Sequence, residues 1–127
     1  MIKYVDLSEG QIKILKKVCD IYNQNLAEVY RRFDQPNSDV MEMVDVLNLD
    51  IGYLRQEVTK DFLKFTDLEE KPSDIIKMGF MELIIIQFII REWAEDEGWN
   101  DLEAYGLINK ITILTELANQ TQKPSLS

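Results

Sequence analysis

Hydrophobic residues recur along most of the chain at intervals of three and four, the spacing that places side chains on one face of an α-helix. Four segments carry this pattern, over residues 8–34, 38–66, 73–96 and 100–120. The most regular stripe belongs to the second segment and runs from Val40 through Leu47 and Leu54 to Phe65. We therefore predict an all-α fold, a four-helix bundle in which residues 1–127 form a single helical domain.

Residues that cap or break helices mark the ends of these segments. Ser8 and Gln11 have the spacing of a capping box at the start of the first segment, and Asn100 and Glu103 repeat it at the start of the fourth. Residues 121–127 have no periodicity, and we expect this tail to fray. The remaining markers are Pro36 followed by Asn37 or Ser38 as the cap of the second helix, Ser73 as the cap of the third, and Gly98 after its end.

The third predicted helix is apolar around nearly its whole circumference. Between Met78 and Ile90 only Glu82 and Gln87 interrupt the hydrophobic run, which is shorter than the ~20 residues that span a bilayer. A helix of this kind is buried on most sides, so we expect it at the centre of the bundle. Because each helix of a lone four-helix bundle keeps one face in water, we also expect a homodimer interface to cover part of it.

The balance of charges limits the partners of the chain. Its 14 Lys and Arg residues against 23 Asp and Glu residues give a net charge of −9 at pH 7. This charge disfavours nucleic acid and anionic membranes, and it favours a basic protein partner. The N-terminal residues do not read as a secretory signal, and a single cysteine cannot form an internal disulfide, so we expect a cytoplasmic protein. A basic group on the first helix is weak evidence for nucleic-acid binding, because no aromatic residues lie between Lys13, Lys16, Lys17, Arg31 and Arg32 on that face.

The absence of histidine removes most of the catalytic arrangements that helical proteins use. It excludes Ser-His-Asp and Cys-His nucleophiles, HExxH metalloprotease sites, histidine-ligated haem and the Glu-x-x-His motif of ferritin-like bundles. The glycines are isolated from one another, so the chain also lacks a Gly-rich phosphate-binding loop. Cys19 lies on the apolar stripe of the first helix, where a thiol is more often packed than reactive. We therefore expect no catalytic residue and no cofactor.

An acidic corner around Trp99 is the candidate partner-binding site. An aromatic ring surrounded by carboxylates can bind a basic protein, because the ring supplies buried area and the acids supply attraction. The alternative is that Trp99 folds back and covers the end of the bundle. The residues of the expected corner are Glu92, Glu95, Asp96, Glu97, Trp99, Asp101, Glu103 and Tyr105.

These observations favour a non-enzymatic protein-interaction module, such as an inhibitor, an immunity protein or an adaptor, that acts on a basic partner. One alternative is a Mg²⁺-dependent all-α nucleotide phosphohydrolase. In that case Asp39, Glu42 and Asp45 would converge on a metal ion, together with Glu82 or Glu92. The other alternative is a binder of small apolar ligands in the bundle core. Its cavity would be lined by Met41, Met43, Met78, Phe80, Met81 and Phe88.

Overall fold

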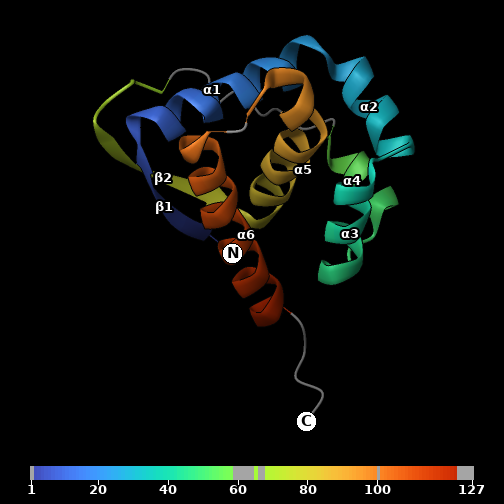
Figure 1. The fold of residues 1–127 in the computed structure, drawn as a ribbon. Coiled ribbons are helices and arrows are strands. Elements are labelled where there is room, and N and C mark those ends of the chain that lie inside the picture. The colour runs from blue at the N-terminus through green and yellow to red at the C-terminus, as the bar shows by residue number, and fades with distance from the viewer. Residues whose placement is uncertain (1, 59–64, 66–67, 100, 123–127) are drawn as a thin grey trace.

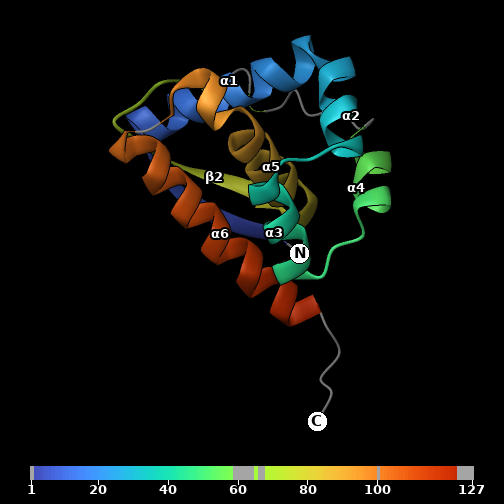
Figure 2. The ribbon, with the colours of Figure 1, turned by 45° about the vertical axis from the view of Figure 1, so that its right-hand side comes forward.

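The computed structural model describes residues 2–58, 65, 68–99 and 101–122, and their side chains up to residue 117. In these ranges the chain forms six helices and a two-stranded antiparallel sheet (Figures 1 and 2). The predicted, mostly helical character is confirmed, but these elements replace the four-helix bundle. In chain order they are β1 (Ile2–Ser8), α1 (Glu9–Gln24), α2 (Leu26–Asp34), α3 (Ser38–Leu47), α4 (Ile51–Glu57), β2 (Ser73–Gly79), α5 (Phe80–Glu97) and α6 (Leu102–Gln122).

Helix α5 lies at the centre of the fold. It packs against α1, α3, α4, α6 and β2, and Figures 1 and 2 show these elements on different sides of it. Every side chain from Leu83 to Ile90 is buried. The predicted central position of the third helix is therefore confirmed. Because its own chain covers α5, the reason for expecting a homodimer interface there is removed, and the homodimer stays a prediction without that support.

Side chains from all of these helices and strands join one hydrophobic cluster. Within it, the rings of Phe33 in α2 and Phe88 in α5 stack with their centroids 3.8 Å apart. The hydroxyl of Tyr22 in α1 donates a hydrogen bond to the carbonyl of Val58, directly after α4. Such contacts join elements that are distant in the sequence into one core.

The sheet occupies two segments that the helical pattern did not predict to be strands. β1 and β2 pair antiparallel over their full length, with Val5 opposite Ile76. Side chains two positions apart share one face of a strand, and here the buried face carries Val5, Leu7, Ile76 and Met78. The prediction of a helix beginning at Ser73 was wrong, because strand pairing buries this alternating set. Each strand then leads directly into a helix, β1 into α1 and β2 into α5.

The first predicted helix, residues 8–34, is divided at Asn25. The backbone at Asn25 has φ of −126° and ψ of 40°, outside the helical region, and α1 and α2 diverge on either side of it (Figure 1). Asparagine has low helix propensity, because its side chain competes for backbone hydrogen bonds. The apolar stripe therefore continues across a point where the helix itself bends.

The second predicted helix, residues 38–66, is also divided. α3 ends at Asn48, which adopts the left-handed conformation with φ of 52°. Asp50 then caps α4, because its carboxylate accepts hydrogen bonds from two N–H groups of the first turn at 3.0 and 3.2 Å. Short polar side chains thus end a helix that periodicity alone would continue. Residues 59–64 and 66 of the prediction lie outside the described residues.

The predicted capping box at the start of α1 is confirmed. Ser8 Oγ accepts a hydrogen bond from the N–H of Gln11 at 3.2 Å, and Gln11 Oε1 accepts one from the N–H of Ser8 at 3.0 Å. Asn37 caps α3 through its side-chain oxygen, as predicted. Asp101 does the same at the start of α6 with a bond of 2.8 Å. The predicted cap Asn100 and the tail residues 123–127 lie outside the described residues.

Helices α1 and α6 approach each other closely at two glycines. A Cβ atom at Gly10 would lie 2.8 Å from the Glu103 side chain, and one at Gly106 would lie 2.7 Å from the Gln11 amide. Ser8 Oγ also donates a hydrogen bond to Glu103 Oε2 at 2.7 Å. These contacts fix the start of α6 against the start of α1, and they orient the later turns of α6 beside α5.

Gly98 ends α5, as predicted, with φ of 64°, a conformation that other residues adopt at a cost. A Cβ atom there would meet no atom within 4 Å, so backbone conformation is the only obstacle to a side chain. We expect Gly98→Ala to lower the free energy of unfolding by about 1 kcal/mol, and Gly98→Asn to lower it less. Chemical denaturation measures both effects. An unchanged stability of Gly98→Ala would contradict this account of the helix end.

Candidate functional site

Two polar side chains interrupt the apolar surface of α5 where α3 and α6 cover it. Gln87 and Arg91 lie four positions apart, so they share one face of the helix. Gln87 is only 1% exposed, and its amide therefore needs hydrogen-bond partners within the protein. This face is where the apolar packing around α5 gives way to polar contacts.

Side chains on α3, α5 and α6 supply the hydrogen-bond partners of Gln87 and Arg91. Arg91 Nη1 donates hydrogen bonds to both carboxylate oxygens of Asp39 at 2.8 and 2.9 Å, and Arg91 Nε donates to Gln87 Oε1 at 3.1 Å. The Thr112 hydroxyl accepts from Arg91 Nη2 and donates to Gln87 Oε1, each at 3.4 Å. Gln87 Nε2 donates to Thr115 Oγ1 at 3.2 Å. The network ties α3 and α6 to α5.

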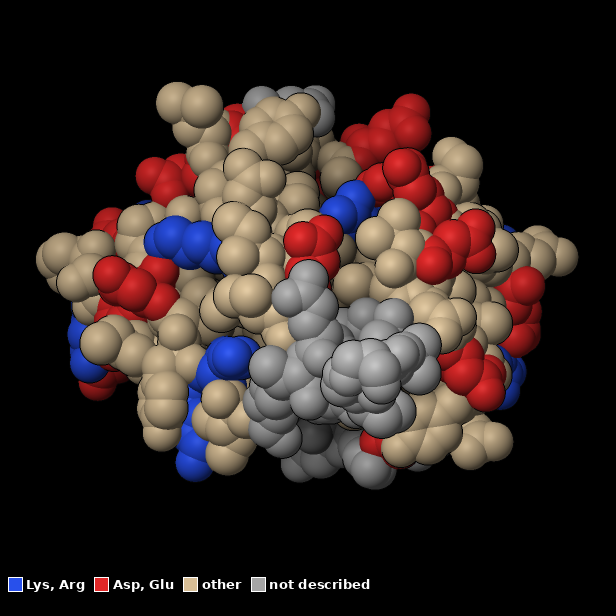
Figure 3. All heavy atoms as spheres, turned by 90° about the horizontal axis from the view of Figure 1, so that it is seen from below, with Lys and Arg blue, Asp and Glu red and all other residues tan. Residues whose placement is uncertain are grey.

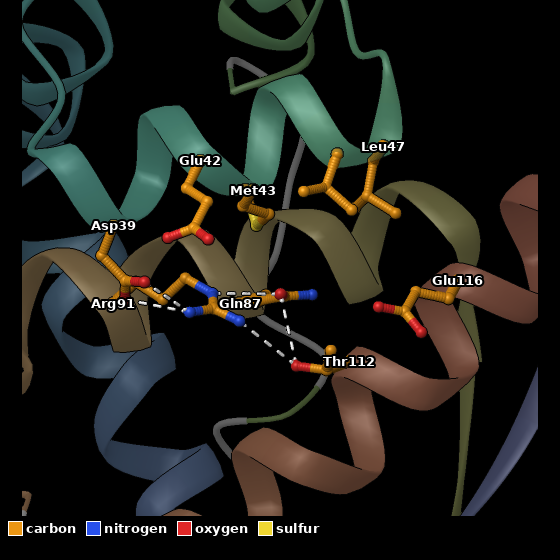
Figure 4. Close-up of a pocket in the computed structure, with 9 residues that line it drawn as sticks. Asp39, Glu42, Met43, Leu47, Gln87, Arg91, Thr112 and Glu116 are labelled. Carbon is orange, nitrogen blue, oxygen red and sulfur yellow. Dashed lines mark hydrogen bonds and ion pairs between the residues drawn. The ribbon is translucent and has the colours of Figure 1, made fainter.

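A pocket of about 190 Å³ opens beside this network, between α3, α5 and α6 (Figure 4). Helix α3 gives it an apolar side made of Met43, Val46 and Leu47. Gln87 and Arg91 line it from α5, next to Thr112 of α6. Its lining therefore combines an apolar wall on α3 with the polar network that joins α3, α5 and α6.

Negative charge is in excess in this pocket. Asp39, Glu42 and Glu116 bring three carboxylates to it, against the single guanidinium of Arg91. Asp39 is engaged by Arg91, whereas Glu42 and Glu116 have no ion pair or hydrogen bond with another described residue. Figure 4 shows the Glu42 carboxylate directed from α3 toward the Arg91 side chain, and the Glu116 carboxylate directed from α6 toward Gln87. The two groups are therefore available to a cation from outside the chain.

Comparison with known proteins does not assign the chain to a family. The sequence matches no protein-family model, and searches of curated proteins and of solved structures give no significant match. Among the helices of the described ranges, none combines the length and apolar character needed to cross a membrane. The pocket therefore has to be interpreted from its own chemistry.

The carboxylates that the phosphohydrolase alternative requires do not converge. Across the described part of the chain, no group of three or more Asp, Glu or Cys side chains is placed to hold a metal ion. Asp39 is bound to a guanidinium, and Asp45 lies on the exposed side of α3. The predicted meeting of these acids with Glu82 or Glu92 at a metal ion was therefore wrong for the residues that the structure describes.

Trp99 is buried in the structure. Its side chain is 7% exposed and belongs to the hydrophobic core, directly after the end of α5. Trp99 therefore covers the end of the core, as the alternative interpretation expected. Tyr105, by contrast, is exposed on α6. The acidic corner thus has no exposed tryptophan with which to contact a partner.

Most acids of the predicted corner bind groups of their own chain. Asp96 pairs with Arg32 at 2.8 Å, and Glu97 pairs with Lys17 at 2.7 Å. Glu103 accepts a hydrogen bond from Ser8 at the start of α1, and Asp101 caps the start of α6. Glu95 is exposed and has no such contact among the described residues. The corner therefore consists largely of charges that stabilise the fold.

Glu92 joins the turn before α3 to the end of α5. Its Oε2 accepts a hydrogen bond from the N–H of Asn37 at 2.8 Å. Burial raises the pKa of the Glu92 carboxyl above its usual range, although the Asn37 hydrogen bond and the guanidinium of Arg32 oppose this shift. Arg32 Nη1 also donates a hydrogen bond to the backbone carbonyl of Glu92 at 2.6 Å. The Cζ atom of the same guanidinium lies 3.9 Å from the centre of the Trp93 ring. These contacts assign Glu92 a structural role.

The basic group of the first predicted helix is paired within the chain. Glu28 accepts hydrogen bonds from Arg31 and Arg32, and these bonds lower the pKa of its carboxyl to about 2. The surface of α1 and α2 therefore has little free positive charge for nucleic acid. The ion pairs are Lys13 with Glu9, Lys16 with Glu70, Lys17 with Glu97, Arg31 with Glu28, and Arg32 with Glu28 and Asp96.

The sulfur-containing residues are mostly part of the packing. Cys19 is fully buried, as expected, and burial together with the charges of Asp20 and Glu82 raises the pKa of its thiol to about 12. Met78 is fully buried in β2, whereas Met41 is exposed on α3. The methionines of the predicted apolar cavity therefore lie in separate environments.

Sequence reasoning named Asp39 and Glu42 but missed Arg91 and Glu116. One signal was present, because Gln87 and Arg91 are four positions apart on an otherwise apolar helix, which indicates a polar contact between buried helices. No comparable sequence pattern indicated that Thr112 and Glu116 of α6 would line the pocket. Which side chains of α6 meet α5 depends on helix packing, and α1 fixes that packing through the two close glycine contacts.

The burial of Trp99 predicts a loss of stability when it is truncated. We expect Trp99→Ala to lower the free energy of unfolding by about 3–5 kcal/mol, and Trp99→Phe to cost less because it leaves a smaller cavity. Tyr105→Ala is the matched control from the same corner, with an expected change within about 0.5 kcal/mol. Chemical denaturation followed by circular dichroism measures all three. Equal stability of Trp99→Ala and the wild type would contradict the buried position.

Proposed function

We propose that this chain is a non-enzymatic protein-interaction module that binds a basic protein partner at the pocket between α3, α5 and α6. The observation that carries the proposal is the pair Glu42 and Glu116, two carboxylates without a partner among the described residues at the edge of a polar hollow. An inhibitor, an immunity protein and an adaptor are the roles that such binding fits. We therefore propose this pocket, in place of the Trp99 corner, as the partner-binding site.

The distribution of charge supports a basic partner. The cations of α1 and α2 are engaged in ion pairs, so they neutralise acids of their own chain and leave the excess of acids elsewhere. Figure 3 shows the molecule from below, with acidic side chains predominating on the right, the side on which α3 and α4 lie in Figure 1. A surface of one sign attracts and orients a partner of the opposite sign.

The rigidity of the pocket also supports a binding role. Its residues lie on three helices, and the Asp39–Arg91–Gln87 contacts hold those helices together at this point. Binding groups on packed helices lose little conformational freedom when a ligand arrives. The helices that carry Glu42 and Glu116 therefore keep their positions when a partner binds, and only these two exposed side chains have to become ordered.

A second copy of the chain is a further proposed partner, at a different surface. The outer face of the sheet carries Ile2, Tyr4 and Ile75, which are 51%, 68% and 64% exposed. Exposed apolar side chains that gather on one face favour contact with another protein. The homodimer proposal therefore concerns this face and not α5.

The proposed function is tested by affinity capture from a lysate of the source cells. Three baits are compared: the wild type, the pocket variant Glu42→Gln/Glu116→Gln, and the control Glu9→Gln/Glu69→Gln. Both variants change the net charge from −9 to −7, and both control residues are exposed. We expect the wild type and the control to retain one basic protein that the pocket variant loses, because neutral amides remove the attraction of the pocket.

Mass spectrometry identifies the retained protein, and binding of the purified partner to the three baits gives the affinities. Equal retention by all three baits would place the binding surface outside the pocket. Retention only of acidic proteins would contradict the charge argument.

A further inference from the structure

We infer that the pocket between α3, α5 and α6 receives a single arginine side chain of the partner. This inference rests on the proposed function and specifies the group that the pocket recognises. Its basis is the combination of an apolar wall, two unpartnered carboxylates on opposite helices, and an internal guanidinium whose charge is already balanced.

The size of the pocket suits one long side chain. Its volume of about 190 Å³ corresponds to roughly six water molecules at the volume that each occupies in the liquid. A helix or strand of a partner is much wider than such a hollow. The partner therefore places a side chain in the pocket, while its backbone stays outside.

The lining matches the two parts of an arginine side chain. Met43, Val46 and Leu47 form an apolar wall against which the methylene stem can pack. Glu42 of α3 and Glu116 of α6 lie on two sides of the pocket, with the Gln87 amide between them (Figure 4). A stem on the apolar wall with its charged head between the two carboxylates uses both parts of the lining.

The internal Arg91 does not exclude a second guanidinium. Asp39 holds Arg91 Nη1 through both of its oxygens, and the Gln87 amide oxygen accepts from Nε. The charge of Arg91 is thereby offset by Asp39, and the charge that remains in the pocket is that of Glu42 and Glu116. The pocket therefore attracts a cation even though it already contains one.

Arginine fits this arrangement better than lysine. The guanidinium is planar, carries several N–H donors on different edges and is weakly hydrated, so it can bind two carboxylates at once in a partly buried site. A lysine ammonium is a compact and strongly hydrated charge. Because Glu42 and Glu116 come from different helices, a donor group with two edges matches them better than a single point charge.

The neighbouring hollow beyond the Asp39–Arg91 pair lacks these features. It is lined by acids of α5, but Glu92 accepts the N–H of Asn37 and Asp96 pairs with Arg32. Of its four carboxylates, those of Asp39, Glu92 and Asp96 are engaged by the fold, and only the exposed Glu95 has no contact among the described residues. The arginine site is confined to the pocket beside Gln87.

The test is a titration of the isotope-labelled full chain with N-acetyl-L-arginine amide, followed by NMR. The controls are the citrulline analogue, which has a similar shape without the charge, and the lysine analogue. We expect the arginine probe to shift the side-chain amide of Gln87 and the backbone N–H of Thr112 in a saturable manner, with a Kd of about 1–10 mM. Glu42→Gln or Glu116→Gln weakens this binding about tenfold, because each removes one charge-assisted contact. Asp45→Asn, on the same helix but outside the pocket, leaves it unchanged.

Three results would overturn the arginine site: equal shifts with the citrulline probe, equal affinity for the lysine probe, or no saturable shift of these two groups. If one of them occurs while capture of a basic protein still depends on Glu42 and Glu116, the arginine inference is wrong and the proposed function stands. If capture is independent of both residues as well, the proposed function is also wrong.

Discussion

The burial of α5 is the constraint on which the rest of the structure depends. A helix that is apolar around its circumference needs cover on every side, and five elements of the same chain supply it. Each fully buried Ile or Leu of this helix stabilises the folded state by about 1.5–3 kcal/mol relative to exposure. The positions of the other elements follow from this need: α1 and α6 cover one part of α5, α3 and α4 another, and β2 places β1 beneath α1.

The pocket arises where this apolar cover is interrupted. Gln87 and Arg91 cannot be buried against hydrophobic side chains alone, so α3 and α6 meet them with Asp39, Thr112 and Thr115. Side chains that make these contacts do not fill the space between the helices completely, and a hollow of about 190 Å³ remains. The same polar contacts that hold three helices together therefore create the binding site that we propose.

Periodicity and end signals predicted the helical character, the central apolar helix and several caps, because each of these depends on residues close together in the sequence. Ser8 and Gln11, for example, form their capping box within one turn. The strands were missed because pairing of Val5 with Ile76 joins segments far apart in the chain. The break at Asn48 was missed because the apolar stripe continues across it. The site was predicted only in part. Asp39 and Glu42 were considered for a different chemistry, and Glu116 lines the same pocket only through the packing of α6.

Glu42 and Glu116 are proposed to serve binding and not folding, and this distinction has a direct test. The measurement is the free energy of unfolding of Glu42→Gln/Glu116→Gln beside that of the wild type, by chemical denaturation at neutral pH. Neither carboxylate has a partner among the described residues, and both add to the net charge of −9. We predict a stability equal to that of the wild type or up to about 0.5 kcal/mol higher. A loss of more than about 1 kcal/mol would mean that these carboxylates support the fold, and it would contradict their role as a free binding site.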